Sequence, residues 1–152
     1  MREIILLAED AADDQVLIKQ ALAKLAPRNQ FHLVPDGDQA IRYLLGDGEY
    51  SDRKRFPLPT LIFLDIKMPR KDGFQVLEWL KGNTFYTRIP VVIVSSSWDP
   101  YDIERAQKSG AMAYVVKSPA MEGLQELFAA TGDFGVKECA FAIFPSHTHS
   151  IH

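Results

Sequence analysis

Polar side chains that could do chemistry follow four apolar runs of this sequence, each at the point where the run ends. In chain order they are Glu9–Asp10, Asp65, Ser95 and Lys117. Carboxylate oxygens are ligands that suit Mg²⁺, which is often held by one or two carboxylates and a phosphoryl oxygen. Three carboxylates brought together would repel one another unless a cation compensated them. These residue types fit phosphoryl transfer onto a carboxylate, with Asp65 as the nucleophile.

The same reasoning gives each of the other residues a role. Glu9, Asp10 and the backbone carbonyl of Lys67 would hold the metal together with Asp65 itself, directly or through water. Lys117 would add a point charge for the remaining phosphoryl oxygens, and Ser95 would add a hydroxyl donor.

These residues can meet only if the chain between them forms a parallel sheet. Short apolar runs alternate with amphipathic stretches, which predicts five strand-helix units and an α/β, doubly wound, five-stranded parallel sheet. The carboxyl ends of parallel strands share one edge, where such sheets place their ligands. The predicted strands cover Ile4–Ala8, Phe31–Val34, Leu61–Leu64, Val91–Val94 and Ala113–Val116. The predicted helices cover Asp13–Leu25, Asp38–Leu45, Phe74–Lys81, residues 99–109 and Pro119 to about Gly132.

Composition excludes several classes of protein. The chain has 152 residues, 47% of them hydrophobic, which favours one globular domain with a real core. A net charge of −3 gives no basic field for nucleic acid. No run approaches the ~20 apolar residues needed to span a bilayer. A lone cysteine, Cys139, excludes a disulfide framework within the chain, so we expect a soluble cytoplasmic protein.

Two segments do not fit the alternation. One is a polar loop, Asp47–Pro59, and the other is the tail that follows the last predicted helix. We expect a domain over residues 1–131 and a tail over residues 132–152. The apolar centre of the tail, Ala140–Phe144, should pack on the domain or form a dimer contact, because apolar patches of this kind usually cover another surface or meet a partner. The terminal histidines 147, 149 and 152 are expected to be a frayed end rather than a metal site.

Four segments together resemble the receiver domain of two-component response regulators. They are Ile5–Asp10, Leu64–Gly73, Val94–Ser96 and Gly110–Lys117, and the resemblance extends over roughly residues 2 to 131. The loop Asp47–Pro59 further resembles that of single-domain regulators which partner bacterial phytochromes and related sensor kinases.

The resemblance implies a (βα)5 flavodoxin-like receiver fold and a stand-alone response regulator. A sensor histidine kinase, of phytochrome type on the narrower resemblance, would phosphorylate Asp65 with Mg²⁺ present. Ser95 would be the switch hydroxyl and Tyr114 the switch aromatic, which would rotate into space vacated by the loop after the fourth strand. Signalling would go through protein contacts, with a homodimer as one candidate. No enzymatic activity is expected beyond self-phosphorylation and dephosphorylation.

Departures from the family pattern leave an alternative open. Ser118 follows Lys117 where the family usually has a proline in a cis peptide, and a cis bond before a non-proline residue costs ~2.5–4 kcal/mol. A degenerate receiver that binds partners without phosphorylation therefore remains an alternative. Lys67 adds a cation near the expected path of the attacking water. We expect it to alter the lifetime of the phosphorylated state, and unchanged dephosphorylation kinetics in Lys67→Asn would contradict this.

Rival readings of the acidic residues are less consistent with the sequence. A phosphohydrolase with an aspartyl-phosphate intermediate would usually carry an Asp two residues after the nucleophile, where this chain has Lys67. A flavin-binding protein would need a phosphate cradle where this chain has the acidic stretch Glu9–Asp14. Asp13 and Asp14 are expected only to cap the first helix.

Overall fold

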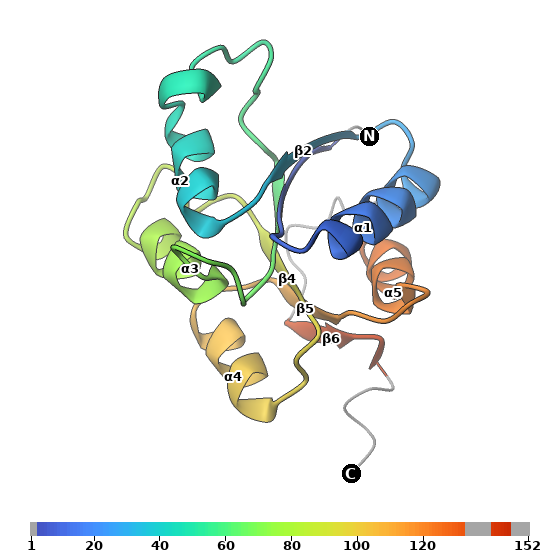
Figure 1. Ribbon diagram of the computed structural model, residues 1–152. Helices are drawn as coiled ribbons and strands as arrows, with labels where there is room; N and C mark the ends of the chain where they lie inside the picture. The colour runs from blue at the N-terminus through green and yellow to red at the C-terminus, as the bar shows by residue number, and fades with distance from the viewer. Residues whose placement is uncertain (1–2, 133–140, 147–152) are drawn as a thin grey trace.

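A parallel sheet lies at the centre of the molecule (Figure 1). The computed structural model describes residues 3–132 and 141–146. Within these residues the sheet has six strands in the order β2-β1-β3-β4-β5-β6, and all neighbours pair in parallel. The strands are β1 Ile4–Ala8, β2 Gln30–Val34, β3 Leu61–Leu64, β4 Val91–Ser95, β5 Ala113–Val116 and β6 Ala142–Phe144. The flavodoxin-like prediction is confirmed, but the predicted count of five strands is wrong by one.

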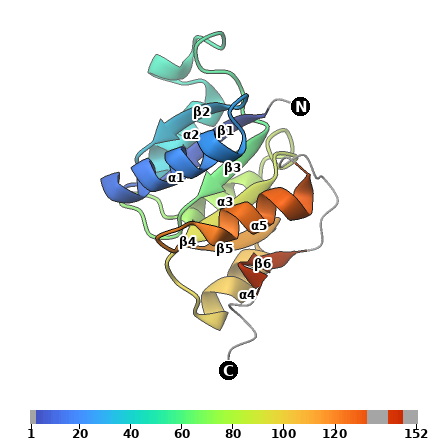
Figure 2. The ribbon, with the colours of Figure 1, turned by 90° about the vertical axis from the view of Figure 1, so that its right-hand side faces the viewer.

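Five α-helices cover the two faces of the sheet within the described residues. They are α1 Ala12–Leu25, α2 Gly37–Leu45, α3 Gly73–Lys81, α4 Pro100–Lys108 and α5 Glu122–Thr131. Helices α1 and α5 lie together on one face, and α2, α3 and α4 cover the other (Figure 2). None of these helices is both long and apolar enough to cross a bilayer.

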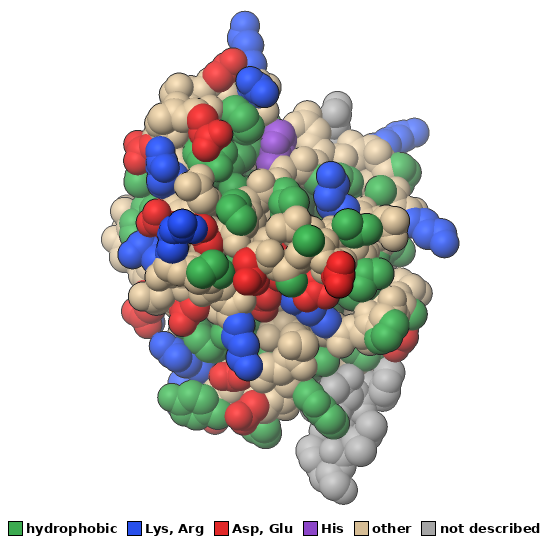
Figure 3. All heavy atoms as spheres, viewed as in Figure 1, with side chains coloured by type: hydrophobic (Ala, Val, Ile, Leu, Met, Phe, Trp, Pro, Cys, Tyr) green, Lys and Arg blue, Asp and Glu red, His purple; other side chains and the backbone are tan. Residues whose placement is uncertain are grey.

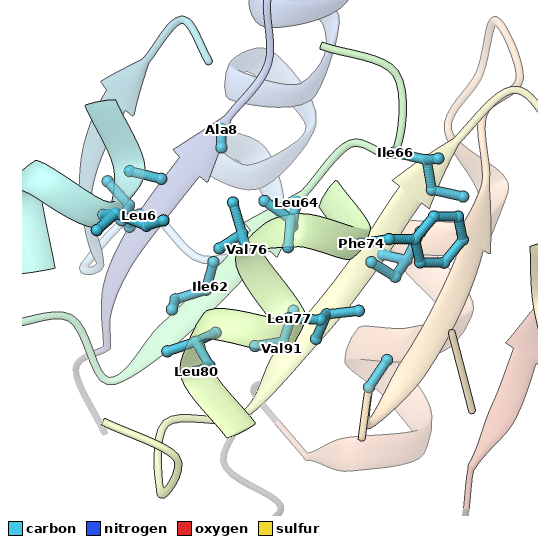
Figure 4. Packing of buried hydrophobic residues seen from close by; sticks show 14 of the residues in the cluster. Leu6, Ala8, Ile62, Leu64, Ile66, Phe74, Val76, Leu77, Leu80 and Val91 are labelled. Atoms are coloured by element: carbon cyan, nitrogen blue, oxygen red, sulfur yellow. The ribbon is translucent and has the colours of Figure 1, made fainter. Parts of the chain in front are cut away.

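The buried strands divide their side chains between two cores. In β1, Leu6 and Ala8 join the core under α2, α3 and α4, whereas Ile5 and Leu7 join the core under α1 and α5. Figure 4 shows the first core, with residues of α3 such as Leu77 pointing at the strands. Burial of both faces explains why these strands are continuous apolar runs rather than alternating ones. The sheet is thereby rigid enough to fix the groups at its carboxyl edge.

Local signals set most helix ends. Asp36 caps α2, and Asp72 caps α3 in a reciprocal capping box with Gln75. Asp99 caps α4 and is followed by a proline in the first turn, as the sequence predicts. The expected start of the last helix at Pro119 is wrong. Met121 has φ 51°, which a helix cannot accommodate, so α5 starts at Glu122.

The loop Asp47–Pro59 is held in place by its own side chains. The guanidinium of Arg53 donates to the carbonyls of Tyr43 and Leu44 at 2.8 and 2.6 Å, so it binds the last turn of α2. The rings of Tyr43, Tyr50 and Phe56 pack on one another at centroid distances of 5.1–6.0 Å. Burial raises the pKa of Tyr43 to about 12, so its hydroxyl stays protonated and donates to the carbonyl of Pro57 at 2.8 Å. The polar loop is therefore a fixed part of the fold.

Strand β6 forms in the segment for which the sequence predicts only an apolar tail. It pairs with β5, bringing Phe144 opposite Val115. Gly123 in α5 makes this approach feasible, because a Cβ there would lie 2.7 Å from the carbonyl oxygen of Phe144. Beyond β6, the backbone N–H of Ser146 donates to the Glu126 carboxylate at 3.0 Å. Cys139, Ala140 and histidines 147, 149 and 152 lie outside the described residues.

We predict that Phe144→Ala lowers the free energy of unfolding by about 3–5 kcal/mol, as for other buried aromatic truncations. Phe144 is 7% exposed and belongs to the core under α1 and α5. Urea unfolding followed by circular dichroism would measure the change. Ser146→Ala is the matched control in the same segment, and its effect should stay within about 0.5 kcal/mol because the residue is exposed. Equal stability of both variants would mean that β6 contributes little.

Candidate functional site

The carboxyl ends of β1, β3 and β5 bring Glu9, Asp65 and Lys117 together, although more than a hundred residues separate the first from the last. Glu9 and Asp65 are buried, at 1% and 7% exposure, and Asp10 is exposed beside them. Figure 3 shows acidic side chains gathered near the middle of one face with a basic side chain among them. The strand order of the sheet brings these side chains together, because it changes direction between β1 and β3, where such sheets place their ligands.

The Lys117 ammonium lies between three carboxylates. Its Nζ is 2.6 Å from Oε1 of Glu9, 2.7 Å from Oδ2 of Asp14 and 3.1 Å from Oδ2 of Asp65. The Lys117 side chain is only 10% exposed, so solvent screens these contacts weakly. The second oxygen of Glu9 accepts the backbone N–H of Ala11 at 3.1 Å. The ammonium is therefore fixed next to the Asp65 carboxylate.

Burial and charge perturb the two partners in opposite ways. Burial raises the pKa of Glu9 to about 7, and the charge of Asp65 adds to this, against the opposing hydrogen bonds from Lys117 and Ala11. Burial acts to lower the pKa of Lys117, but its hydrogen bonds to Asp14 and Glu9 and the charge of Asp65 keep that pKa above its ordinary value. The lysine stays charged, and the carboxylates around it carry more negative charge than one ammonium can balance.

The donor set fits a hard divalent cation. Oxygens of Glu9, Asp10 and Asp65 all lie within 4.8 Å of one another. Such all-oxygen carboxylate sets suit Mg²⁺ and similar ions, which leave coordination positions for water and phosphoryl oxygens. Lys67, whose carbonyl the sequence also predicts as a ligand, lies in the exposed turn that follows Ile66. The three carboxylates are thus the part of the predicted ligand set that the structure brings together.

The turn after Asp65 is held by close backbone contacts that the sequence alone did not reveal. The N–H of Gly73 donates to the carbonyl of Ile66 at 2.9 Å, and a Cβ on Gly73 would overlap the carbonyl oxygen of Asp65. The N–H of Gly37, at the start of α2, donates to the carbonyl of Lys71 at 3.0 Å. These contacts fix the backbone that carries Asp65.

A salt bridge adds to these contacts. Arg70 donates to the buried carboxylate of Asp36 at 2.8 Å, which ties the same turn to the cap of α2. The backbone of Arg70 has φ 64°, an uncommon conformation for a residue other than glycine. No sequence signal pointed to this pairing of Asp36 with Arg70, because the partners are 34 residues apart.

Ser95 and Tyr114 lie beside the site and are joined through Ser97. Ser95, at the end of β4, is buried, and its Oγ accepts the N–H of Ser97 at 3.2 Å. The hydroxyl of Tyr114 donates to the Ser97 carbonyl at 2.6 Å, and the Ser97 hydroxyl donates to Asp102 of α4 at 2.7 Å. Tyr114 is fully buried in this structure. Ser97, for which the sequence predicts no role, links Tyr114 to α4 through these two hydrogen bonds.

One prediction about neighbouring residues is wrong, and one question that the sequence leaves open is answered. The prediction that Asp13 and Asp14 only cap α1 is wrong: Ala11 is at the cap position without a side-chain bond, and Asp14 binds Lys117 instead. Phe144–Pro145 is the one cis peptide among the described residues, so the Lys117–Ser118 peptide is trans.

Comparison with known proteins agrees with this arrangement. The family model of the response regulator receiver domain matches residues 5–129. The response regulator Rcp1 of Synechocystis sp. is 33% identical over 126 residues, which cover 83% of this chain and 82% of that protein.

Solved structures give the same result. The phosphorylated cyanobacterial phytochrome response regulator RcpA is similar with a TM-score of 0.75 and 34% identity, over 88% of this chain and 94% of that one. The Mn²⁺-bound form of Rcp1 is similar with a TM-score of 0.74 and 30% identity, over 84% and 92% of the two chains. The family model spans most of this chain, and these relatives match it over most of their own length. The chain therefore belongs to the response regulator receiver domain family.

Proposed function

We propose that this protein is a response regulator whose Asp65 accepts a phosphoryl group from a sensor histidine kinase in a Mg²⁺-dependent reaction. The observation that carries the proposal is the position of Lys117, whose ammonium lies 3.1 Å from the Asp65 carboxylate beside three clustered carboxylates. Structural similarity to a phosphorylated regulator supports the same role for Asp65.

The chemistry follows from the residues at the site. An Asp65 oxygen would attack the phosphorus of a phosphohistidine, and the P–N bond would break as the P–O bond forms, so that the imidazole nitrogen leaves with the bonding electrons. Glu9, Asp10 and the Lys67 carbonyl would hold the cation, which when bound supplies positive charge to the phosphoryl oxygens. Lys117 would donate to a phosphoryl oxygen, and Ser95 would donate to another.

The output would follow from the contacts of Ser95 and Tyr114. Movement of Ser95 toward a phosphoryl oxygen would shift Ser97, whose carbonyl accepts the Tyr114 hydroxyl and whose own hydroxyl binds Asp102. The change at Asp65 would thereby reach α4. Tyr114, which is fully buried in this structure, would act as the switch aromatic, and its rotation would break this hydrogen bond.

The remaining assignments are part of the same proposal. Similarity to the cyanobacterial phytochrome response regulator RcpA supports a phytochrome-type kinase as the phosphodonor. The protein would act in the cytoplasm, as a signalling protein rather than an enzyme with an external substrate, and through contacts that include a homodimer as one candidate. Residues 1–131 would form the receiver domain. The pairing of β6 with β5 supports a tail, residues 132–152, that packs partly on this domain.

Incubation with acetyl phosphate and Mg²⁺, followed by intact-mass spectrometry, tests the proposal. Wild-type protein should gain one phosphoryl group, and Asp65→Asn should gain none, because an amide cannot form the acyl phosphate. Asp72→Asn is the control, since Asp72 is an acidic residue in the same loop whose side chain caps α3. If wild-type protein stayed unmodified, the alternative of a phosphorylation-independent binding module would replace this proposal.

A further inference from the structure

We propose that Asp14 competes with the phosphoryl group for the Lys117 ammonium and so limits how tightly the site holds a phosphorylated Asp65. This inference rests on the proposed function of Asp65. It gives Asp14 a role in setting the balance between the free and phosphorylated states.

The number of hydrogen-bond donors on Lys117 limits how many anionic groups it can bind. A lysine ammonium has three N–H donors and no acceptor. In the described part of the chain Lys117 contacts three carboxylates, those of Glu9, Asp14 and Asp65, at 2.6, 2.7 and 3.1 Å. All three donors are thus in use before any phosphoryl group arrives. For Lys117 to donate to a phosphoryl oxygen, one of these contacts must be released or shared.

Of the three contacts of Lys117, the one with Asp14 can be broken at the lowest free-energy cost. Glu9 is 1% exposed, so water cannot solvate its carboxylate if it leaves Lys117. Asp65 is itself the phosphoacceptor. Asp14 lies in the first turn of α1, outside the carboxylate cluster that suits a divalent cation, with 34% of its side chain exposed. Water can therefore solvate the Asp14 carboxylate when it leaves Lys117, which keeps the desolvation penalty small.

Asp14 and a phosphoryl group on Asp65 also repel each other. A phosphoryl group brings about −1.5 to −2 charges, the same sign as Asp14, to the other side of the same ammonium. Asp14 then both occupies a donor and repels the incoming anion. Removal of the Asp14 charge should therefore raise the affinity of the site for the anion. The expected gain is on the order of tenfold, the effect of a partly screened unit charge at this distance.

The probe is beryllofluoride, which forms an acyl-phosphate-like adduct on an aspartate, titrated at saturating Mg²⁺ and followed by NMR. Asp14→Asn and Asp14→Ala should each bind it on the order of tenfold more tightly than wild type. Protein labelled with acetyl phosphate should lose its phosphoryl group correspondingly more slowly in both variants. Two variants guard against a folding defect in either one.

Asp13→Asn is the matched control. Asp13 carries the same charge in the same first turn of α1 but is exposed and is not among the three carboxylates that contact Lys117 in the described residues. Its affinity should remain within about twofold of wild type, since it bears only on the helix dipole. Circular dichroism spectra of Asp13→Asn and Asp14→Asn should match that of wild type, which separates competition from loss of the fold.

The outcomes are distinct. Tighter binding in both Asp14 variants and unchanged binding in Asp13→Asn would support the competition. If wild-type protein binds beryllofluoride and Asp14→Asn binds it no more tightly than Asp13→Asn, the competition is refuted while the proposed function stands. If wild-type protein does not form the adduct at all, both are overturned.

Discussion

Replacement of Lys117 by methionine should destabilise the protein by about 3–5 kcal/mol in the absence of divalent cations, the cost of removing one partner of a buried ion pair. Methionine keeps the apolar stem but removes the only cation that contacts Glu9, Asp14 and Asp65 in the described structure. Glu9, 1% exposed, would then face Asp65 without compensation. The same change should abolish phosphorylation of Asp65, because no ammonium remains for the phosphoryl oxygens.

Urea unfolding in EDTA and in Mg²⁺ would measure this effect. We expect Mg²⁺ to restore part of the lost stability, because a ligand that binds only the folded state stabilises it. Lys108→Met is the control: Lys108 pairs with Glu104 in a contact where both side chains are largely exposed, so its loss should leave the stability nearly unchanged. A Lys117→Met protein as stable as wild type in EDTA would show that the carboxylates need no cation.

Gly73→Ala should lower the free energy of unfolding by about 2–3 kcal/mol, a typical cost of overpacking. A Cβ at this position would overlap the carbonyl oxygen of Asp65 and lie 3.0 Å from Cα of Ile66, and both are backbone atoms that cannot turn aside. The strand end that carries Asp65 would have to shift. Phosphorylation by acetyl phosphate should therefore slow on the order of a hundredfold, as for a misplaced reacting group.

Gly82→Ala provides the comparison for this prediction. Gly82 follows α3 with φ −81°, and an added Cβ there would meet its nearest neighbour, the Trp79 carbonyl oxygen, at an ordinary 3.7 Å. This variant should be as stable as wild type or more stable by about 0.4–1 kcal/mol, through the unfolded state. Thermal and urea unfolding of the two variants side by side would decide; equal losses would refute the argument from the close approach at Gly73.

The sequence predicted the core of this fold well because local signals and burial agreed. The apolar runs Leu61–Leu64 and Ala113–Val116 are the observed strands residue for residue. Asp99–Pro100 marked the start of α4 correctly. Convergence of Glu9, Asp65 and Lys117 was predictable for the same reason, since parallel strands that alternate with helices place their carboxyl ends on one edge. Such inferences need only the order of elements along the chain.

The sequence could not predict features that depend on long-range contacts. Strand β6 has three residues and forms only because the edge of β5 and the small Gly123 are available to it. Contact between Asp14 and Lys117 depends on how α1 is oriented at the site, which no spacing encodes. The late start of α5 follows from the left-handed backbone of Met121, a residue type that rarely adopts it.

Strand β6 also determines how the sheet can meet other chains. An exposed strand edge presents unpaired N–H and C=O groups that can recruit strands from other molecules and seed aggregates. With β6 in place, β5 has hydrogen-bonded neighbours on both sides, and the outermost strand on this side is only three residues long. Pro145 follows it directly and lacks an N–H to extend the ladder. The short terminal strand is therefore a poor template for fibre growth, which would help the protein remain dispersed at high concentration.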